Sequence, residues 1–166
     1  MRVLALDGID LRGLEILREA GMEVTVHGKM NEAELKEALH DDYEALLVRS
    51  GTRVTAAAIN AAKKLKIIGR AGVGTDNIDV AAATEKGLVV VNAPEGNTVA
   101  AAEHTIAMMM ALARNIPQAN ATLKQGIWDK KKYVGVELRG KTLGVIGLGK
   151  IGREGARRAR GFAMQV

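Results

Sequence analysis

Short apolar segments alternate with amphipathic ones through the first ninety residues, and this pattern predicts alternating strands and helices. The apolar segments are continuous runs, which are typical of strands in a parallel sheet that is covered on both faces. The predicted strands are Arg2–Leu6, Glu23–Val26, Ala45–Val48, Lys66–Ile68 and Leu88–Val91. The predicted helices between them are Leu11–Ala20, Asn31–Leu39, Thr55–Leu65 and Asp79–Lys86. With short, right-handed connections, these elements predict a small doubly wound, flavodoxin-like α/β domain.

Three of these helices carry start signals. Asn31 is followed three residues later by Glu34, which is the spacing of a capping box with Asn in the Ser/Thr position. Thr55 and Asp79 are residue types that favour the N-cap position.

The second part of the chain begins after Asn92–Asn97, a predicted linker that holds one of the two prolines. A helix is predicted over Thr98–Ile116, and its Ala/Met-rich circumference indicates burial between subunits or domains. His104 and the run Met108–Met110 are interpreted as structural residues of this helix. A polar arm, Gln118–Arg139, follows. The predicted domains are therefore residues 1–93 and residues 97–166.

A glycine-rich turn lies near the end of the sequence, between a predicted strand, Leu143–Ile146, and a predicted helix, Lys150–Phe162. Gly147, Gly149 and Gly152 have the G-x-G-x-x-G spacing of a dinucleotide-binding turn. The first glycine permits a tight turn, the second lets the backbone approach a pyrophosphate, and the third lets the helix pack closely. The anion would lie at the helix N-terminus. Because a strand precedes it and a helix follows, a nucleotide site is favoured over an ordinary glycine turn.

Two loops follow neighbouring predicted strands at their carboxyl ends, where open α/β sheets bind ligands. They are Arg49–Arg53 and the glycine-rich Gly69–Gly74. Arg49 and Arg70 can each offer a planar guanidinium to an oxyanion, and the glycine-rich backbone can form an anion nest. The alternative is that the glycines only make a turn and the arginines are solvated. Since both loops lie at one sheet edge, an anion site is favoured.

Composition excludes several classes of protein. There is no cysteine, so disulfides, thiolate metal sites and cysteine nucleophiles are excluded, and no metal-ligand spacing is present. The apolar run Val99–Leu112 is interrupted by Glu103 and His104, which argues against a membrane span. No signal-peptide apolar region follows Met1. We therefore expect a cytoplasmic protein without a membrane partner.

The formal net charge of +5 is concentrated in the last third, where eleven basic and three acidic residues lie between Lys124 and Arg160. Such a surface suits nucleic acid, a membrane or an anionic small ligand, and the glycine turn favours the last. On the final helix, Lys150, Arg153, Arg157 and Arg160 fall on one predicted exposed face. No aromatic residues are interleaved with them for base stacking, so nucleic-acid binding is a secondary alternative.

Several separated motifs, in order over essentially all 166 residues, resemble the D-2-hydroxyacid dehydrogenases. The matching segments are Leu46–Thr52, Gly69–Asp79, Asn97–Thr98, Ala102–His104 and Gly140–Glu154. The Trp128–Tyr133 arm, followed by Gly135 and Glu137-Leu138, narrows the resemblance to one member enzyme of that family.

The resemblance implies an oxidoreductase that uses NAD to oxidise a 2-hydroxy acid to a 2-oxo acid. It implies a substrate site for the carboxylate or phosphate end, formed by Arg49, Ser50, Arg70, Gly72, Val73 and Gly74. It implies a cofactor site formed by Val73, Gly147, Gly149, Lys150, Ile151 and Gly152. Residues 1–93 would be most of a substrate-binding domain, and residues 97–166 would begin a Rossmann cofactor domain. The Thr98–Ile116 helix and the following arm would form a homo-oligomer contact.

The family's catalytic Arg and its His–Glu pair have no counterpart among these residues, so no catalytic residue is assigned. The acidic residue that binds the ribose would fall beyond Val166, and the choice of NAD over NADP rests on the resemblance. The chain is interpreted as the N-terminal portion of such an enzyme, inactive when isolated. The alternatives are a non-catalytic module that binds NAD or anions and dimerises, and a nucleic-acid binder that uses the basic helix.

Overall fold

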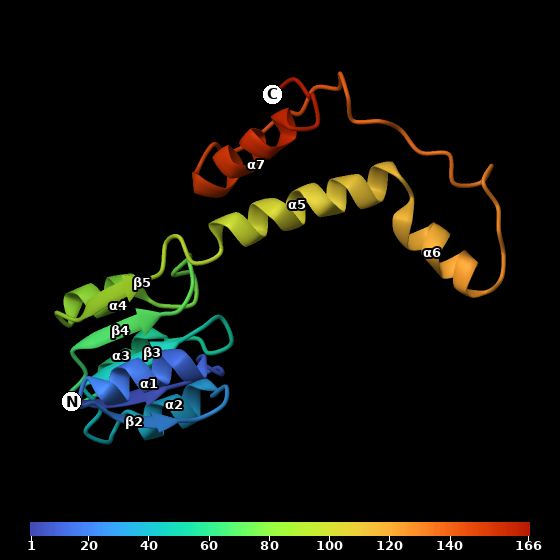
Figure 1. Ribbon diagram of the computed structural model, residues 1–166. Coiled ribbons are helices and arrows are strands. Elements are labelled where there is room, and N and C mark those ends of the chain that lie inside the picture. Colours follow the sequence, from blue (N-terminus) through green and yellow to red (C-terminus); the bar gives the residue numbers. More distant parts are fainter. The chain divides into compact units, whose positions relative to one another are not determined.

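The computed structural model describes all 166 residues of the chain. They form two compact units, unit 1 over Met1–Gly96 and unit 2 over Asn97–Val166. Unit 1 holds a sheet with its helices, and unit 2 is built from helices joined by irregular segments (Figure 1).

Unit 1 contains a five-stranded, all-parallel sheet with the strand order β2-β1-β3-β4-β5. This is the flavodoxin-like order, so the predicted α/β fold class is confirmed. The strands are β1 (Arg2–Ala5), β2 (Glu23–Val26), β3 (Ala45–Val48), β4 (Ile67–Arg70) and β5 (Val89–Asn92). All five predicted strands form, with β4 and β5 displaced by one or two residues toward the C-terminus.

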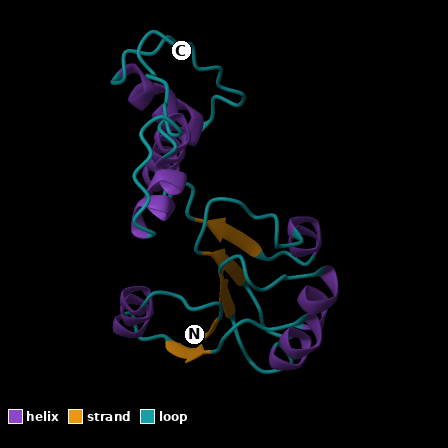
Figure 2. Cartoon of the chain, turned by 90° about the vertical axis from the view of Figure 1, so that its right-hand side faces the viewer, coloured by secondary structure: helices purple, strands orange, loops and turns teal.

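Helices cover both faces of this sheet (Figure 2). They are α1 (Leu11–Glu19), α2 (Glu32–Ala38), α3 (Ala56–Ala61) and α4 (Val80–Glu85). The capping box at α2 is confirmed, because Asn31 Oδ1 accepts from the Glu34 amide at 3.0 Å while Glu34 Oε2 accepts from the Asn31 amide at 2.8 Å. The predicted caps Thr55 and Asp79 also accept bonds from the amides of their N3 residues.

Helix α3 is shorter than predicted, since it ends at Ala61 rather than Leu65. The ammonium group of Lys86, at the end of α4, donates hydrogen bonds to the carbonyl oxygens of Ile59, Asn60 and Ala62. These bonds supply a donor to carbonyl groups at the end of the helix, where Ile59 O also accepts from the Ala62 amide. The Lys86 side chain, from a distant segment, therefore stabilises the C-terminus of α3 at Ala61.

The core of unit 1 lies between the central strands and the helices. Leu4, Leu46 and Ile68, from the three central strands, are at most 1% exposed. Burying each such side chain contributes about 1.5–3 kcal/mol. The edge strand β5 is different, because Val89 and Val91 remain 56% and 44% exposed.

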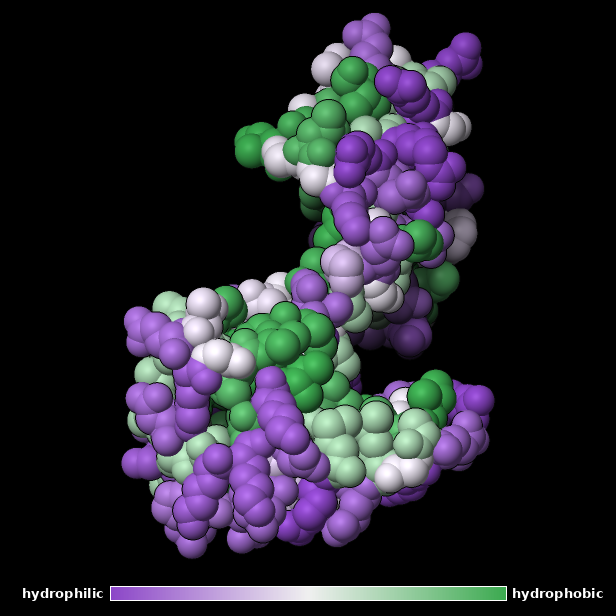
Figure 3. Space-filling view, turned by 90° about the vertical axis from the view of Figure 1, so that its left-hand side faces the viewer, coloured by the Kyte–Doolittle hydropathy of each residue, from purple (hydrophilic) through white to green (hydrophobic).

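Unit 2 contains α5 (Thr98–Ala113), α6 (Ile116–Lys124) and α7 (Lys150–Arg160). Helices α5 and α7 pack together around Ile106, Ala159 and Met164. Within this chain α7 covers only one side of α5, and Met108 and Leu112 are 59% and 77% exposed. The predicted burial of α5 between subunits or domains stays a prediction. Figure 3 shows hydrophobic residues at the surface of the chain among hydrophilic ones.

The helix predicted over Thr98–Ile116 ends three residues early, and the first residues of the predicted polar arm belong to a second helix. Helix α5 ends at Ala113, and Asn115 takes a left-handed conformation with φ 54° before α6 begins. Pro117 lies in the first turn of α6, where its missing N–H costs nothing, whereas it would break a continuous helix. Only the part of the arm after α6 is irregular.

The predicted strand Leu143–Ile146 does not form as a regular strand. A single bridge joins Thr142 to Gln165, with hydrogen bonds from the Leu143 amide to Gln165 O and from the Gln165 amide to Lys141 O. A strand requires a partner along its length, and Gln165 supplies one pairing position only. As a result Ile146 is fully exposed.

No helix of the structure combines the length and apolar character needed to cross a bilayer. No cluster of His, Asp or Glu side chains is arranged to hold a metal ion.

Candidate functional site

The carboxyl edge of the unit 1 sheet has a topological switch point between β1 and β3. The chain leaves β1 in one direction along the sheet to reach β2, and it then crosses back to β3. Open α/β sheets bind ligands in the crevice outside such a point. Asp7 and Gly8 follow β1, and residues 49–53 follow β3, so the first predicted anion loop lies at this point.

Side chains from elsewhere in the sequence hold the 49–53 loop. The Asp7 carboxylate accepts hydrogen bonds from the Arg49 amide at 3.0 Å, from the Thr52 amide at 2.9 Å and from the Thr52 hydroxyl at 2.6 Å. Asn77 Nδ2 donates to the carbonyl oxygens of Arg49 and Thr52 at 2.8 and 2.6 Å. The Arg49 and Ser50 side chains are exposed and have no partner within the chain. Both are therefore available to an anion.

The hydrogen bonds around the Asp7 side chain favour its ionised form. Partial burial raises its pKa, but hydrogen bonds from Thr52, Arg49 and Gly51 together lower the pKa by more than burial raises it. The pKa therefore lies below the usual value of 3.8. Asp7 therefore accepts these bonds as an anion at neutral pH.

The second predicted anion loop, Gly69–Gly74, encloses the Arg70 side chain. Arg70 is 10% exposed, its Nη1 donates to the Gly74 carbonyl and lies 3.4 Å from Asp76 Oδ1, and its Nε is buried without a partner. The guanidinium is thus folded under the loop and only partly satisfied. It does not extend into solvent as a free planar fork.

Two side chains, Arg70 of this loop and Asp76 just after it, closely approach Gly74. A Cβ on Gly74 would lie 3.0 Å from Arg70 Nη1 and 2.5 Å from Asp76 Oδ1. The Gly72 amide donates to Arg70 O, and Asn92 Nδ2 donates to Val73 O at 2.6 Å. The amides of Val73 and Gly74 have no partner in the chain. They are the groups of this loop that can donate to an anion.

Asp7, Thr52 and Asn77 received no role from the sequence. One signal was present, because an Asp-Gly pair directly after a strand marks a turn that needs positive φ. In the structure Asp7 and Gly8 have φ angles of 63° and 68°. The contacts of Thr52 and Asn77 depend on tertiary structure and have no local signal.

The glycine turn in unit 2 leads directly into α7 and leaves the N-cap of that helix uncovered. Gly147 has a φ of 91°, which favours glycine. A Cβ on Gly152 would lie 2.2 Å from Gly147 O, so the third glycine allows the helix to pack on the turn. Gly149 is the N-cap of α7, makes no side-chain capping bond and has open space around it. The residues present therefore fit a dinucleotide's diphosphate at the N-terminus of α7.

The basic face of α7 is exposed as predicted, at Lys150, Arg153, Arg157 and Arg160. Part of its charge is neutralised within the helix. Glu154 accepts hydrogen bonds from Arg157 and Arg158, and these bonds lower the pKa of its carboxyl.

Arg158 connects the two packed helices of unit 2. Its Nη2 lies 3.2 Å from Glu103 Oε1 on α5, and its side chain is 18% exposed. Hydrogen bonds to Glu154 and Glu103 raise the pKa of its guanidinium. Arg158 is therefore a structural residue of the α5–α7 contact.

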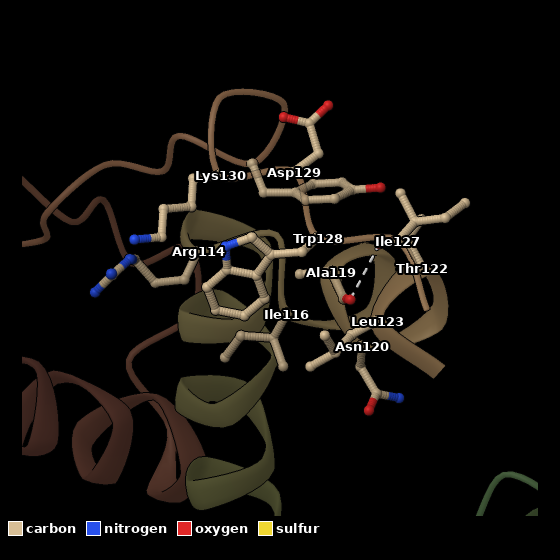
Figure 4. Close-up of a pocket in the computed structure, with 11 residues that line it drawn as sticks. Arg114, Ile116, Ala119, Asn120, Thr122, Leu123, Ile127, Trp128, Asp129 and Lys130 are labelled. Atoms are coloured by element: carbon tan, nitrogen blue, oxygen red, sulfur yellow. Dashed lines mark hydrogen bonds between the residues drawn. The ribbon is translucent and has the colours of Figure 1, made fainter. Parts of the chain in front are cut away.

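A pocket of about 470 Å³ lies between α6 and the segment that follows it (Figure 4). The Trp128 ring borders it and is 70% exposed, and Lys130 Nζ lies 5.6 Å from the ring centroid. None of the predicted substrate or cofactor residues lines this pocket. It is a mainly apolar surface in the region expected to contact another subunit.

The model of the catalytic domain of the D-isomer specific 2-hydroxyacid dehydrogenases matches residues 3–159. The chain therefore belongs to this family of oxidoreductases, as the resemblance predicted. Among curated relatives, D-3-phosphoglycerate dehydrogenase of Archaeoglobus fulgidus is 54% identical over 166 residues, and the human enzyme of the same name is 51% identical over 165 residues. The narrower match predicted from the Trp128–Tyr133 arm is confirmed.

The alignments cover 100% and 99% of this chain but 31% of each of those two relatives. The chain thus spans about a third of their length. Solved structures agree with the fold. The TT0316 protein from Thermus thermophilus matches with a TM-score of 0.90 and 36% identity, over 99% of this chain and 54% of that one.

Two further neighbours bear on the cofactor. The NAD-dependent formate dehydrogenase from Staphylococcus aureus, solved with NAD, matches with a TM-score of 0.84 and 29% identity, over 99% of this chain and 54% of that one. An acyclic imino acid reductase solved with NADPH matches with a TM-score of 0.88 and 29% identity, over 100% and 55% of the two chains. Proteins of this fold therefore bind nicotinamide dinucleotides of both kinds.

Proposed function

We propose that this chain supplies the substrate-binding part and the first segment of the cofactor-binding part of an NAD-dependent D-3-phosphoglycerate dehydrogenase. The reaction is the oxidation of 3-phosphoglycerate to 3-phosphohydroxypyruvate, in serine biosynthesis. The observation that carries the proposal is the pair of loops at the carboxyl edge of unit 1, where the exposed Arg49 and Ser50 side chains and the unpartnered amides of Val73 and Gly74 can bind anions. Identity with curated relatives above 50% supports the choice of substrate.

In this proposal residues 1–93 bind the substrate. A guanidinium matches the geometry of a carboxylate or phosphate, so Arg49 with Ser50 receives one anionic end of 3-phosphoglycerate. The backbone of Gly72, Val73 and Gly74 receives the other through its amides. Arg70 supports this loop from below through its hydrogen bond to the Gly74 carbonyl.

Residues 97–166 begin the cofactor site. Gly147, Gly149 and Gly152, with Lys150 and Ile151 in the first turn of α7, would hold the diphosphate of NAD. Val73, from the substrate part, is the remaining residue assigned to cofactor contact. A bound NAD would supply the acceptor for the hydride from C2 of the substrate.

The role of the residues in this chain is to bind and orient, and none of them is assigned as the base that removes the hydroxyl proton. Hydride transfer requires reactants held in near-attack geometry and a general base. We therefore expect the isolated chain to bind ligands without turnover. The test is to mix the purified chain with 3-phosphoglycerate and NAD and to follow the formation of NADH by its absorbance. Turnover above background would contradict the expectation.

We also propose that the chain forms a homo-oligomer through α5 and the segment from α6 to Arg139. The apolar side chains Leu112, Trp128 and Val134 are 77%, 70% and 77% exposed, and a second copy would cover them. This observation also favours the alternative function, a non-catalytic module that binds NAD or anions and dimerises. Calorimetry separates the two functions, because a general anion site binds inorganic phosphate as well as 3-phosphoglycerate, whereas a substrate site prefers 3-phosphoglycerate and loses that preference in Arg49→Ala.

A further inference from the structure

Three segments that are far apart in the sequence meet at a buried polar cluster beside the switch point. Thr52 is fully buried, and its hydroxyl donates to Asp7 Oδ1 at 2.6 Å and accepts from the Met30 amide at 3.2 Å. Asp7 follows β1, Thr52 lies in the loop after β3, and Asn77 lies beyond β4. The cluster therefore joins the loops that flank the candidate substrate site.

Asp7 and Asn77 bind opposite polar groups of the same two residues. Asp7 accepts from the N–H groups of Arg49 and Thr52, and Asn77 donates to their C=O groups. The backbone is held at both ends, and only Ser50 and Gly51 lie between the two fixed points. The apex of the loop is thus set by these two side chains.

No backbone–backbone hydrogen bond involves residues 49–53. Neighbouring positions do have them, since the Val54 amide donates to Asn77 O and the Ala71 amide donates to Val48 O. The loop is therefore tied to the sheet by side chains alone. The conformation of the loop therefore depends on Asp7, Thr52 and Asn77, because no hydrogen bonds of the strand-pairing kind hold it.

The fit around Asp7 is close. A Cβ on Gly51 would lie 2.8 Å from Asp7 Oδ1, so the loop packs directly on the carboxylate. Asp7 also adopts a φ of 63°, an uncommon conformation that Asp tolerates better than most residues. A carboxylate beside a site for anions is electrostatically unfavourable, and its use as an acceptor for the loop amides explains why one is found there.

We propose that Asp7 and Asn77 are positioning residues, which hold residues 49–52 in the conformation that presents Arg49 and Ser50 to the anionic end of the substrate. The assignment of Arg49 and Ser50 to the substrate rests on the proposed function. Neither Asp7 nor Asn77 touches the substrate; each acts through the loop.

The test compares four variants of the 166-residue chain with the unmodified chain, by amide hydrogen exchange in NMR and by calorimetric titration of 3-phosphoglycerate. Asp7→Asn and Asn77→Asp each place a group of the wrong polarity against the loop. Both are expected to speed exchange of the Arg49 and Thr52 amides by about tenfold, and to weaken binding by about the same factor, because one or two hydrogen bonds are lost. Thr52→Val is expected to act in the same direction, whereas Thr52→Ser keeps the hydroxyl and restores both readouts.

Glu44→Gln is the matched control. Glu44 is also a carboxylate that accepts from a backbone amide and a side chain, Arg2 and Lys66, but it precedes β3 at the opposite edge of the sheet. It is expected to leave exchange in the 49–52 loop unchanged. If it accelerates exchange there as much as Asp7→Asn does, the effect is a general loss of stability and the proposal is overturned.

The proposal also fails if Asp7→Asn and Asn77→Asp fold and leave the Arg49 and Thr52 amides as protected as before. If either variant does not fold, the Thr52→Val and Thr52→Ser pair decides by the same criterion. If the unmodified chain does not bind 3-phosphoglycerate, the proposed function fails, and the exchange comparison still determines whether the side chains hold the loop.

Discussion

Gly152 lies against the carbonyl group of Gly147 with no room for a side chain, since a Cβ at this position would be 2.2 Å from the oxygen. The contact is between backbone groups, so no flexible side chain can move aside. It ties the first turn of α7 to the glycine turn that precedes it.

Gly152→Ala is therefore expected to destabilise unit 2 by about 1–3 kcal/mol, as overpacking does, and to abolish NAD binding. Urea unfolding followed by circular dichroism, with a calorimetric NAD titration, measures both effects. Gly155→Ala is the control, because a Cβ there meets nothing within 4 Å and alanine favours a helix over glycine by about 1 kcal/mol. Equal behaviour of the two variants would contradict the prediction.

Lys86→Met is expected to destabilise unit 1 by about 1–3 kcal/mol. The change removes the donor to the Ala62 carbonyl and one of the two donors to the Ile59 carbonyl, and both lost bonds are partly buried. Lys64→Met serves as the comparison, because the Lys64–Asp42 ion pair is 58% and 54% exposed and such pairs contribute about 0–1 kcal/mol. Urea midpoints that shift equally for both variants would show that Lys86 does not cap α3.

Acid is expected to destabilise unit 1 through Asp7. Its pKa in the folded chain is below the ordinary value of 3.8, so the stability it contributes is fully present above that value. This contribution is lost as the pH falls through the lowered folded pKa. Thermal unfolding between about pH 6 and pH 2.5 should show a fall in Tm at the acid end that is smaller in Asp7→Asn. An identical pH profile for the variant would refute this role of Asp7.

Leu112→Glu is expected to convert an oligomer of the chain into monomers, because it places a charge in the exposed apolar face of α5. Light scattering after size-exclusion chromatography gives the mass. Leu11→Glu is the matched control, because Leu11 is similarly exposed, at 74%, but lies in unit 1. This variant should leave the mass unchanged. A monomeric unmodified chain would contradict the proposed contact.

The sequence was sufficient to predict much of unit 1. Strands such as β3 are continuous apolar runs in a parallel sheet, and their buried residues leave little choice of register. Local hydrogen bonds at Asn31, Thr55 and Asp79 set the helix starts, so capping types alone located them. The two candidate anion loops could be placed at one edge of the sheet because each follows a strand at its carboxyl end.

The features that were missed depend on tertiary structure. The bonds from Asp7 to Thr52 and from Asn77 to Arg49 span 45 and 28 residues, and no local pattern encodes them. Pro117 was present in the sequence, but its place in a first turn became evident only from the left-handed Asn115 before it. Hydrophobic residues at Leu143–Ile146 indicate a strand, yet pairing requires neighbours that one bridge does not supply.

The open edge at β5 has a consequence for handling the chain. Val89 and Val91 stand exposed along a strand that pairs on one side only, with β4. Such a border displays a row of peptide groups and aliphatic side chains on which another polypeptide can align. Concentrated preparations of the chain should therefore be prone to strand-to-strand aggregation, and a lysine at position 89 would be a direct means of preventing it.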